Sequence, residues 1–139
     1  MTTEQDANKA IVARFNQQFI AGGDMDLFHR TIAPGFINHT PHPGQSDGPD
    51  GVAYFFNHVL RPAFPDLTVT IHDQVAEDDR VVTRKTYRGT HHAGFLGIPA
   101  TGRTVTFGVI DIIRLREGRY LEHWAVADMA GLRAQLQAI

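Results

Sequence analysis

The chain contains no cysteine, which excludes disulfide bonds, cysteine nucleophiles and thiolate metal sites. It also has little excess charge: the formal net charge is −2, which provides no basic field for a nucleic-acid backbone or an anionic membrane. No stretch approaches the roughly 20 apolar residues of a membrane-spanning helix. The first ten residues, MTTEQDANKA, lack the apolar core of a secretory signal. These absences predict a cytoplasmic protein that binds neither nucleic acid nor membrane.

The first half of the chain has helical patterns of apolar residues. With 139 residues, of which 42% are hydrophobic and 20% charged, the composition is that of one globular domain spanning 1–139. Thr3 and Asp6 can cap a first helix, which Gly22-Gly23 ends. Asp24 can cap a second helix, broken at Pro34-Gly35, and Pro49 can open a third that runs to about residue 64.

The second half alternates apolar and polar residues, which is typical of half-buried strands. The strands are predicted at 67–75, 80–91, 104–116 and 120–127, after a short earlier strand at 36–39, and Asp128 caps a closing helix. Helices followed by hairpin-linked strands indicate an α+β fold. We expect a strongly curved antiparallel sheet that the N-terminal helices close into a cone, with one internal pocket for a small apolar molecule.

Several stretches of the sequence are similar to those of a known family. They are FINHTP (36–41), AFPDL (63–67), EDDRVV (77–82), RGTHHAGFLGIPATGR (88–103) and DIIRLREGRYLEHWAVADMAGL (111–132). With these motifs the chain resembles the SnoaL-like polyketide cyclases, in the superfamily of α+β barrels that includes ketosteroid isomerase and scytalone dehydratase. The resemblance implies a homodimeric, cofactor-independent enzyme that closes a ring in a polyketide ester by an intramolecular aldol reaction.

The resemblance also implies positions for the site. The family's anthracycline cyclases use an aspartate two residues beyond a histidine on the last strand, and these positions correspond to His123 and Ala125, so the carboxylate is missing here. Asp111 stands where the family has a histidine and resembles the oxyanion-hole aspartate of ketosteroid isomerases. Pocket positions on the first strand and on the first and third helices correspond to Asn38-His39, Phe15 and Phe55.

Asp111 is also a candidate on the residues alone. Alternation places it on the same face of its strand as Val105, Phe107, Val109 and Ile113. Burial among apolar side chains should raise the pKa of its carboxyl, which suits a general acid/base near neutral pH. The structural alternative is an aspartate bonded to a backbone amide or paired with an arginine.

The position of His123 relative to Asp111 depends on the hairpin turn between their strands. A three-residue turn at 116–118 places Asp111 opposite His123, close enough to form a bond, whereas a two-residue turn at 117–118 places it opposite Trp124. The first agrees with the family pattern and is preferred. His123 is then either a base with a fixed tautomer or an interior histidine with satisfied hydrogen bonds.

The remaining candidates have equally plain structural alternatives. His39 is either a base at the pocket mouth or an exposed histidine before a loop, and Trp124 lines either the pocket or the core. His91-His92 and the pair His39 and His42 lack a third ligand at useful spacing, so no metal is expected.

The leading interpretation is a cofactor-independent lyase or isomerase acting on an apolar or aromatic carbonyl compound. Asp111 and His123 would move protons, and Phe15, Phe55 and Trp124 would shape the pocket. Two rivals remain, a cyclase-derived hydroxylase or hydrolase and a non-catalytic ligand-binding or dimerisation module.

Overall fold

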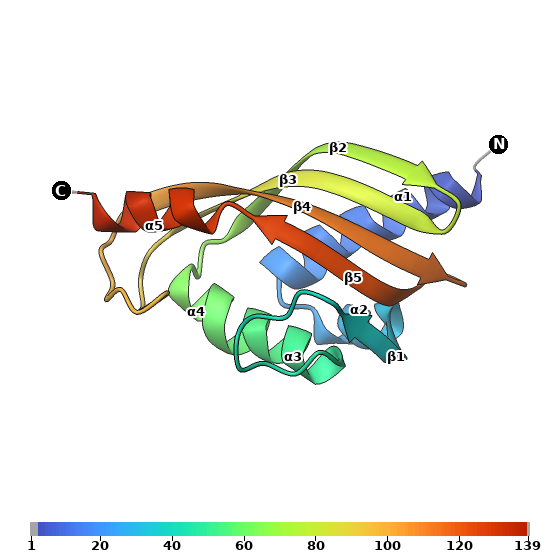
Figure 1. The fold of residues 1–139 in the computed structure, drawn as a ribbon, viewed down its shortest axis with the longest axis horizontal. Helices are drawn as coiled ribbons and strands as arrows, with labels where there is room; N and C mark the ends of the chain where they lie inside the picture. Colours follow the sequence, from blue (N-terminus) through green and yellow to red (C-terminus); the bar gives the residue numbers. More distant parts are fainter. Residues whose placement is uncertain (1–2, 139) are drawn as a thin grey trace.

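Five strands form one curved sheet in the computed structural model, which describes residues 3–138 (Figure 1). They are β1 (Ile32–Asn38), β2 (Thr68–Glu77), β3 (Arg80–Thr90), β4 (Thr104–Arg116) and β5 (Arg119–Ala127). Their order across the sheet is β1-β5-β4-β3-β2, so the sheet is open between β1 and β2. The predicted α+β fold with a curved sheet and covering helices is confirmed.

One pairing differs from the predicted antiparallel sheet. The pairs β2–β3, β3–β4 and β4–β5 are antiparallel, but β1 runs parallel to β5. Parallel neighbours need a long crossover connection, and here the whole chain between β1 and β5 supplies it. Pro34, expected to break a helix, lies inside β1 because this edge strand tolerates a missing N–H.

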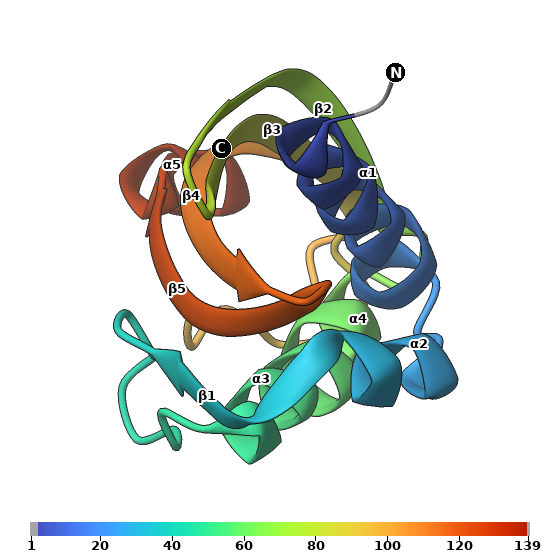
Figure 2. The same ribbon diagram turned by 90° about the vertical axis from the view of Figure 1, so that its right-hand side faces the viewer.

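The helical segments that precede β2 lie on the concave side of the sheet, whereas the last one packs beside β4 (Figure 2). The helical segments are α1 (Glu4–Phe15), η1 (Asn16–Ala21), α2 (Met25–Thr31), α3 (Pro49–Tyr54), η2 (Phe55–Leu60), α4 (Arg61–Ala63) and α5 (Met129–Gln137), of which η1 and η2 are π-helical. The predicted caps are present, because Thr3 and Asp6 form a capping box and Asp24 and Asp128 accept bonds from helical N–H groups. Within residues 3–138, no helix is long and apolar enough to cross a bilayer.

An aromatic cluster joins the helices to the sheet. The Phe15 ring lies 5.0 Å from that of Phe19 and 4.8 Å from that of Tyr120, measured between centroids. Phe19 also packs on Phe28, with 4.8 Å between their centroids. These spacings are those of favourable aromatic pairs, so the cluster fixes α1 and η1 against the sheet.

The β4–β5 hairpin has a register that differs from both sequence-based alternatives. Its turn has two residues, Glu117 and Gly118, with φ of 51° and 76°, and Arg116 pairs with Arg119. The register then shifts by one at Leu121, which stands between the paired positions Tyr120 and Glu122. As a result Asp111 lies opposite Ala125, rather than opposite His123 or Trp124.

Candidate active site

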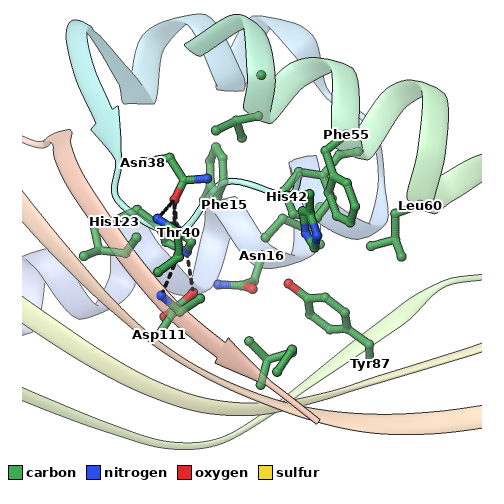
Figure 3. Close-up of a pocket in the computed structure, with 18 of the residues that line it drawn as sticks. Phe15, Asn16, Asn38, Thr40, His42, Phe55, Leu60, Tyr87, Asp111 and His123 are labelled. Carbon is green, nitrogen blue, oxygen red and sulfur yellow. Dashed lines mark hydrogen bonds and ion pairs between the residues drawn. The ribbon is translucent and has the colours of Figure 1, made fainter. Parts of the chain in front are cut away.

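A cavity of about 210 Å³ lies between the concave face of the sheet and the helices. Its walls are mainly apolar, and Phe15 and Phe55 line it together with Asp111, as the sequence predicted (Figure 3). For comparison, an engineered apolar cavity of about 150 Å³ holds benzene. This cavity is therefore large enough for a molecule of one or two rings.

Both π-helices border the cavity. Asn16 is the first residue of η1 and Phe55 the first of η2, and both line the cavity. A π-helical turn is rare and is frequently found at functional sites. Asn16 bonds back to the Val12 carbonyl oxygen through its Nδ2 atom at 2.9 Å, which leaves its Oδ1 free to accept.

The polar end of the cavity is built on a buried ion pair that sequence reasoning missed. Lys85 Nζ donates to Asp111 Oδ2 at 3.0 Å and to Asn16 Oδ1 at 2.7 Å. Only 1% of the Lys85 side chain and 6% of the Asp111 side chain are exposed. The signal was in the pattern of β3, where Lys85 alternates in phase with the buried residues Val81 and Tyr87.

The ion pair reverses the predicted shift of Asp111. Burial would raise the pKa of this carboxyl, as expected, but the Lys85 ammonium and, after it, His123 hold the pKa below its usual value. Burial would likewise lower the pKa of Lys85, and the Asp111 carboxylate raises it instead. Asp111 is therefore an ionised carboxylate at neutral pH, and the prediction of a raised pKa is wrong.

His123 lines the cavity in one defined tautomer. Asn38 Oδ1 accepts from the Thr40 backbone N–H at 3.0 Å, which identifies that amide atom as the oxygen. The same oxygen lies 2.8 Å from His123 Nδ1, so Nδ1 must carry a hydrogen. In the neutral imidazole Nε2 is then the unprotonated nitrogen, and it lies 3.8 Å from Asp111 Oδ2.

Asn38, predicted to bind substrate, lines the cavity and also contacts His123 from the neighbouring strand. The two residues are direct partners in the parallel β1–β5 pair. His123 and Asp111 do approach each other as predicted, but diagonally across the β4–β5 pair rather than face to face. Ala125, the direct partner of Asp111, also lines the cavity.

His39 and Trp124 do not line the cavity, contrary to expectation. Their rings stack at 4.6 Å with an interplanar angle of 11°, and His39 Nε2 lies 3.0 Å from a Glu122 carboxylate oxygen. Strand alternation explains the placement, because Trp124 lies between the cavity residues His123 and Ala125 and must face the other side.

A second histidine faces the cavity instead. His42 stacks on Phe55 with 3.9 Å between centroids, and burial, followed by the nearby His123, lowers its pKa. It therefore presents a neutral imidazole at neutral pH. No cluster of three or more His, Asp or Glu side chains within residues 3–138 has the arrangement of a metal site.

Fold and site together define a class of protein: a cone of one curved sheet and covering helices, with an apolar cavity that ends in buried titratable groups. A family model described as SnoaL-like polyketide cyclase matches residues 10–136. The chain belongs to the SnoaL-like polyketide cyclase family. Among curated proteins, none matches the sequence.

Solved structures agree with this assignment. TsrD from Streptomyces laurentii is 28% identical over 99% of both chains, with a TM-score of 0.86. IdmH from Streptomyces antibioticus, described as a candidate polyketide cyclase, is 31% identical over 93% of this chain and 97% of its own, with a TM-score of 0.82. AclR from Streptomyces galilaeus, described as a candidate hydroxylase, is 26% identical over 100% of this chain and 84% of its own, with a TM-score of 0.78.

Proposed function

We propose that the chain is a cofactor-independent enzyme that closes a ring in a small apolar carbonyl compound by proton transfer at His123. The supporting observation is the fixed tautomer of this histidine, which leaves Nε2 as a base at the polar end of an apolar cavity. Family membership and the similarity to the candidate cyclase IdmH support ring closure as the outcome.

The reaction is an intramolecular aldol addition in three steps. His123 Nε2 takes a proton from the carbon next to a carbonyl, which leaves an enolate and an imidazolium. The enolate carbon attacks a second carbonyl carbon of the same molecule, which forms the new C–C bond and an alkoxide. The imidazolium then returns its proton to the alkoxide, so the base is regenerated and no cofactor is consumed.

Asp111 acts in this proposal through its charge and not as the proton carrier. Its pKa is held low chiefly by the Lys85 ammonium, so it is a weak base at neutral pH. Its carboxylate faces His123 Nε2 at 3.8 Å and stabilises the imidazolium that forms during the reaction. The leading sequence-based interpretation had given proton transfer to both Asp111 and His123, and the pairing of Asp111 with Lys85 is the reason to assign it to His123 alone.

The first test measures proton abstraction without the natural substrate. The probe is 2-tetralone, a two-ring apolar ketone, in D₂O, with exchange of its α-protons followed by NMR. The protein should accelerate exchange, and His123→Gln should slow the protein-catalysed rate roughly 100-fold or more, because general base catalysis is lost. His58→Gln is the matched control, since His58 is exposed on η2 and does not line the cavity. Equal rates for His123→Gln and the wild-type protein would remove His123 from the mechanism.

A non-catalytic ligand-binding module is the second candidate. It is favoured by Ala125, which places no ionisable group directly opposite Asp111. This candidate predicts that 2-tetralone binds in the cavity while its exchange rate stays at the solvent value. The similarity to AclR, described as a candidate hydroxylase, makes hydroxylation the alternative reaction, and product analysis with O₂ present tests for it.

A further inference from the structure

Tyr87 has a hydroxyl in the cavity that the reaction scheme above does not use. It lies on β3, two residues after Lys85, and its exposed fraction is 6%. Figure 3 shows the hydroxyl directed toward the middle of the cavity, on the side opposite His123. Within residues 3–138, no side chain or backbone carbonyl accepts a hydrogen bond from this hydroxyl. The hydroxyl opens on the cavity, where a ligand can supply the acceptor that it lacks.

The neighbouring Lys85 cannot be that acceptor. Its ammonium lies 5.2 Å from the centroid of the Tyr87 ring, and an ammonium group has donors only. Burial raises the pKa of Tyr87, and Asp111 adds to this effect while Lys85 partly offsets it. Tyr87 is therefore a neutral phenol throughout the neutral pH range, with its O–H available to an acceptor.

We propose that Tyr87 is a further catalytic residue, which donates a hydrogen bond to the substrate's carbonyl oxygen and to the enolate oxygen formed from it. This assignment rests on the proposed proton transfer at His123. The substrate lies between the two residues, so the base takes the α-proton from one side while the phenol holds the oxygen on the other. Tyr87 transfers no proton in this step. The bond strengthens as negative charge develops on the oxygen, and this difference accelerates the reaction.

The assignment also predicts which small molecules the cavity prefers. A ketone or ester supplies the acceptor that Tyr87 lacks, whereas a hydrocarbon of the same shape leaves the phenol unpaired. The cavity should therefore bind 2-tetralone more tightly than tetralin, by about 10-fold on the scale of one buried hydrogen bond. This preference can be measured in the wild-type protein, without any substitution.

The decisive experiment uses 2-tetralone labelled with ¹³C at its carbonyl carbon. Hydrogen bonding to the oxygen moves the ¹³C resonance of the bound ketone downfield, and Tyr87→Phe should return it toward its position in an apolar solvent. Tyr87→Phe should also remove the preference for ketone over tetralin and slow α-proton exchange about 100-fold, as loss of one oxyanion donor does. Tyr54→Phe is the matched control, because Tyr54 is 56% exposed and does not line the cavity.

The melting temperature of the same variant tests the assignment independently. Tyr87→Phe removes a hydroxyl that donates to no group of the protein, but it also takes an interaction partner from the Lys85 ammonium. The melting temperature should therefore fall by about 3 °C at most, on the scale of one lost hydrogen bond. A much larger fall would mean that the hydroxyl has a further structural partner, and this result would overturn the assignment.

The outcomes separate this inference from the proposed function. If exchange is catalysed but neither its rate nor the ¹³C shift depends on Tyr87, the Tyr87 assignment fails and the role of His123 stands. If the shift depends on Tyr87 but no exchange occurs, Tyr87 binds the carbonyl and the proposed reaction fails. Equal affinity of the wild-type protein for 2-tetralone and tetralin also overturns the assignment.

Discussion

Replacing either partner of the Lys85–Asp111 pair should destabilise the protein strongly, whereas replacing both should not. Lys85→Met leaves the Asp111 carboxylate without its ammonium partner, and Asp111→Leu leaves the Lys85 ammonium as an unpaired buried charge. Breaking a buried ion pair in this way costs about 3–5 kcal/mol. Replacing both with apolar residues of similar volume is often neutral, apart from about 1 kcal/mol for the donor that Asn16 Oδ1 loses.

The sum of the single effects is therefore about 6–10 kcal/mol, against roughly 1–2 kcal/mol for the double variant. Urea unfolding of all four proteins at pH 7 measures the difference as a coupling free energy. Each single variant should also melt roughly 10 °C or more below the wild-type protein, at about 3 °C per kcal/mol for a domain of this size.

The chain contains a matched control pair whose cation, Arg84, lies on the same strand as Lys85. Arg84 is next to Lys85 and pairs with Asp73 at 2.6 Å, but 55% and 59% of these two side chains are exposed. Solvent screening should hold the coupling of this pair below about 1 kcal/mol. If the effects of replacing Lys85 and Asp111 are additive, with a coupling free energy no larger than that of the surface pair, the argument that each buried charge compensates for the burial of the other is refuted.

Three further predictions concern pH, packing and the tautomer. The folded state lowers the pKa of Asp111, so its contribution to stability is present above pH about 4 and is lost as pH falls through the folded pKa. In urea titrations between pH 2 and 6, the stability of the double variant Lys85→Met, Asp111→Leu should therefore depend less on acid than that of the wild-type protein. Gly89→Ala brings a Cβ within 2.7 Å of a phenylalanine side chain and should cost about 1–3 kcal/mol in chemical unfolding, whereas Gly108→Ala, which meets nothing within 4 Å, should cost little. Asn38→Ala frees the His123 tautomer and should slow α-proton exchange while the melting temperature changes little; an unaltered rate would contradict the tautomer argument.

Sequence patterns were most informative where one strand or helix determines its own structure. The alternation of β4 predicts both its bounds and the inward side chain of Asp111, and the caps at Thr3, Asp24 and Asp128 follow from local hydrogen bonding. Such features depend on residues a few positions apart, so a single sequence contains them.

Features that depend on distant segments were not predictable in the same way. The pKa of Asp111 is set by Lys85, 26 residues away, and an inward-facing lysine on an alternating strand is easily interpreted as exposed. The parallel β1–β5 pair joins segments more than 80 residues apart, and alternation does not encode strand direction. The position of Trp124 depended on a hairpin register that combines a two-residue turn with an extra residue.

That extra residue, Leu121, shifts the alternation of β5, so the side chains after it point to the opposite face of the sheet from the one that an unbroken strand would give them. Tyr120 and His123 are three positions apart, and an unbroken strand would send two such side chains to opposite faces. Both line the cavity here because the alternation restarts after the bulge. Deleting Leu121 would therefore turn His123, Ala125 and Ala127 away from the cavity as a group while the hairpin turn and Tyr120 keep their places. The face of the sheet on which the imidazole lies is thus decided by the number of residues that precede it in the strand, and not by any contact that the imidazole makes.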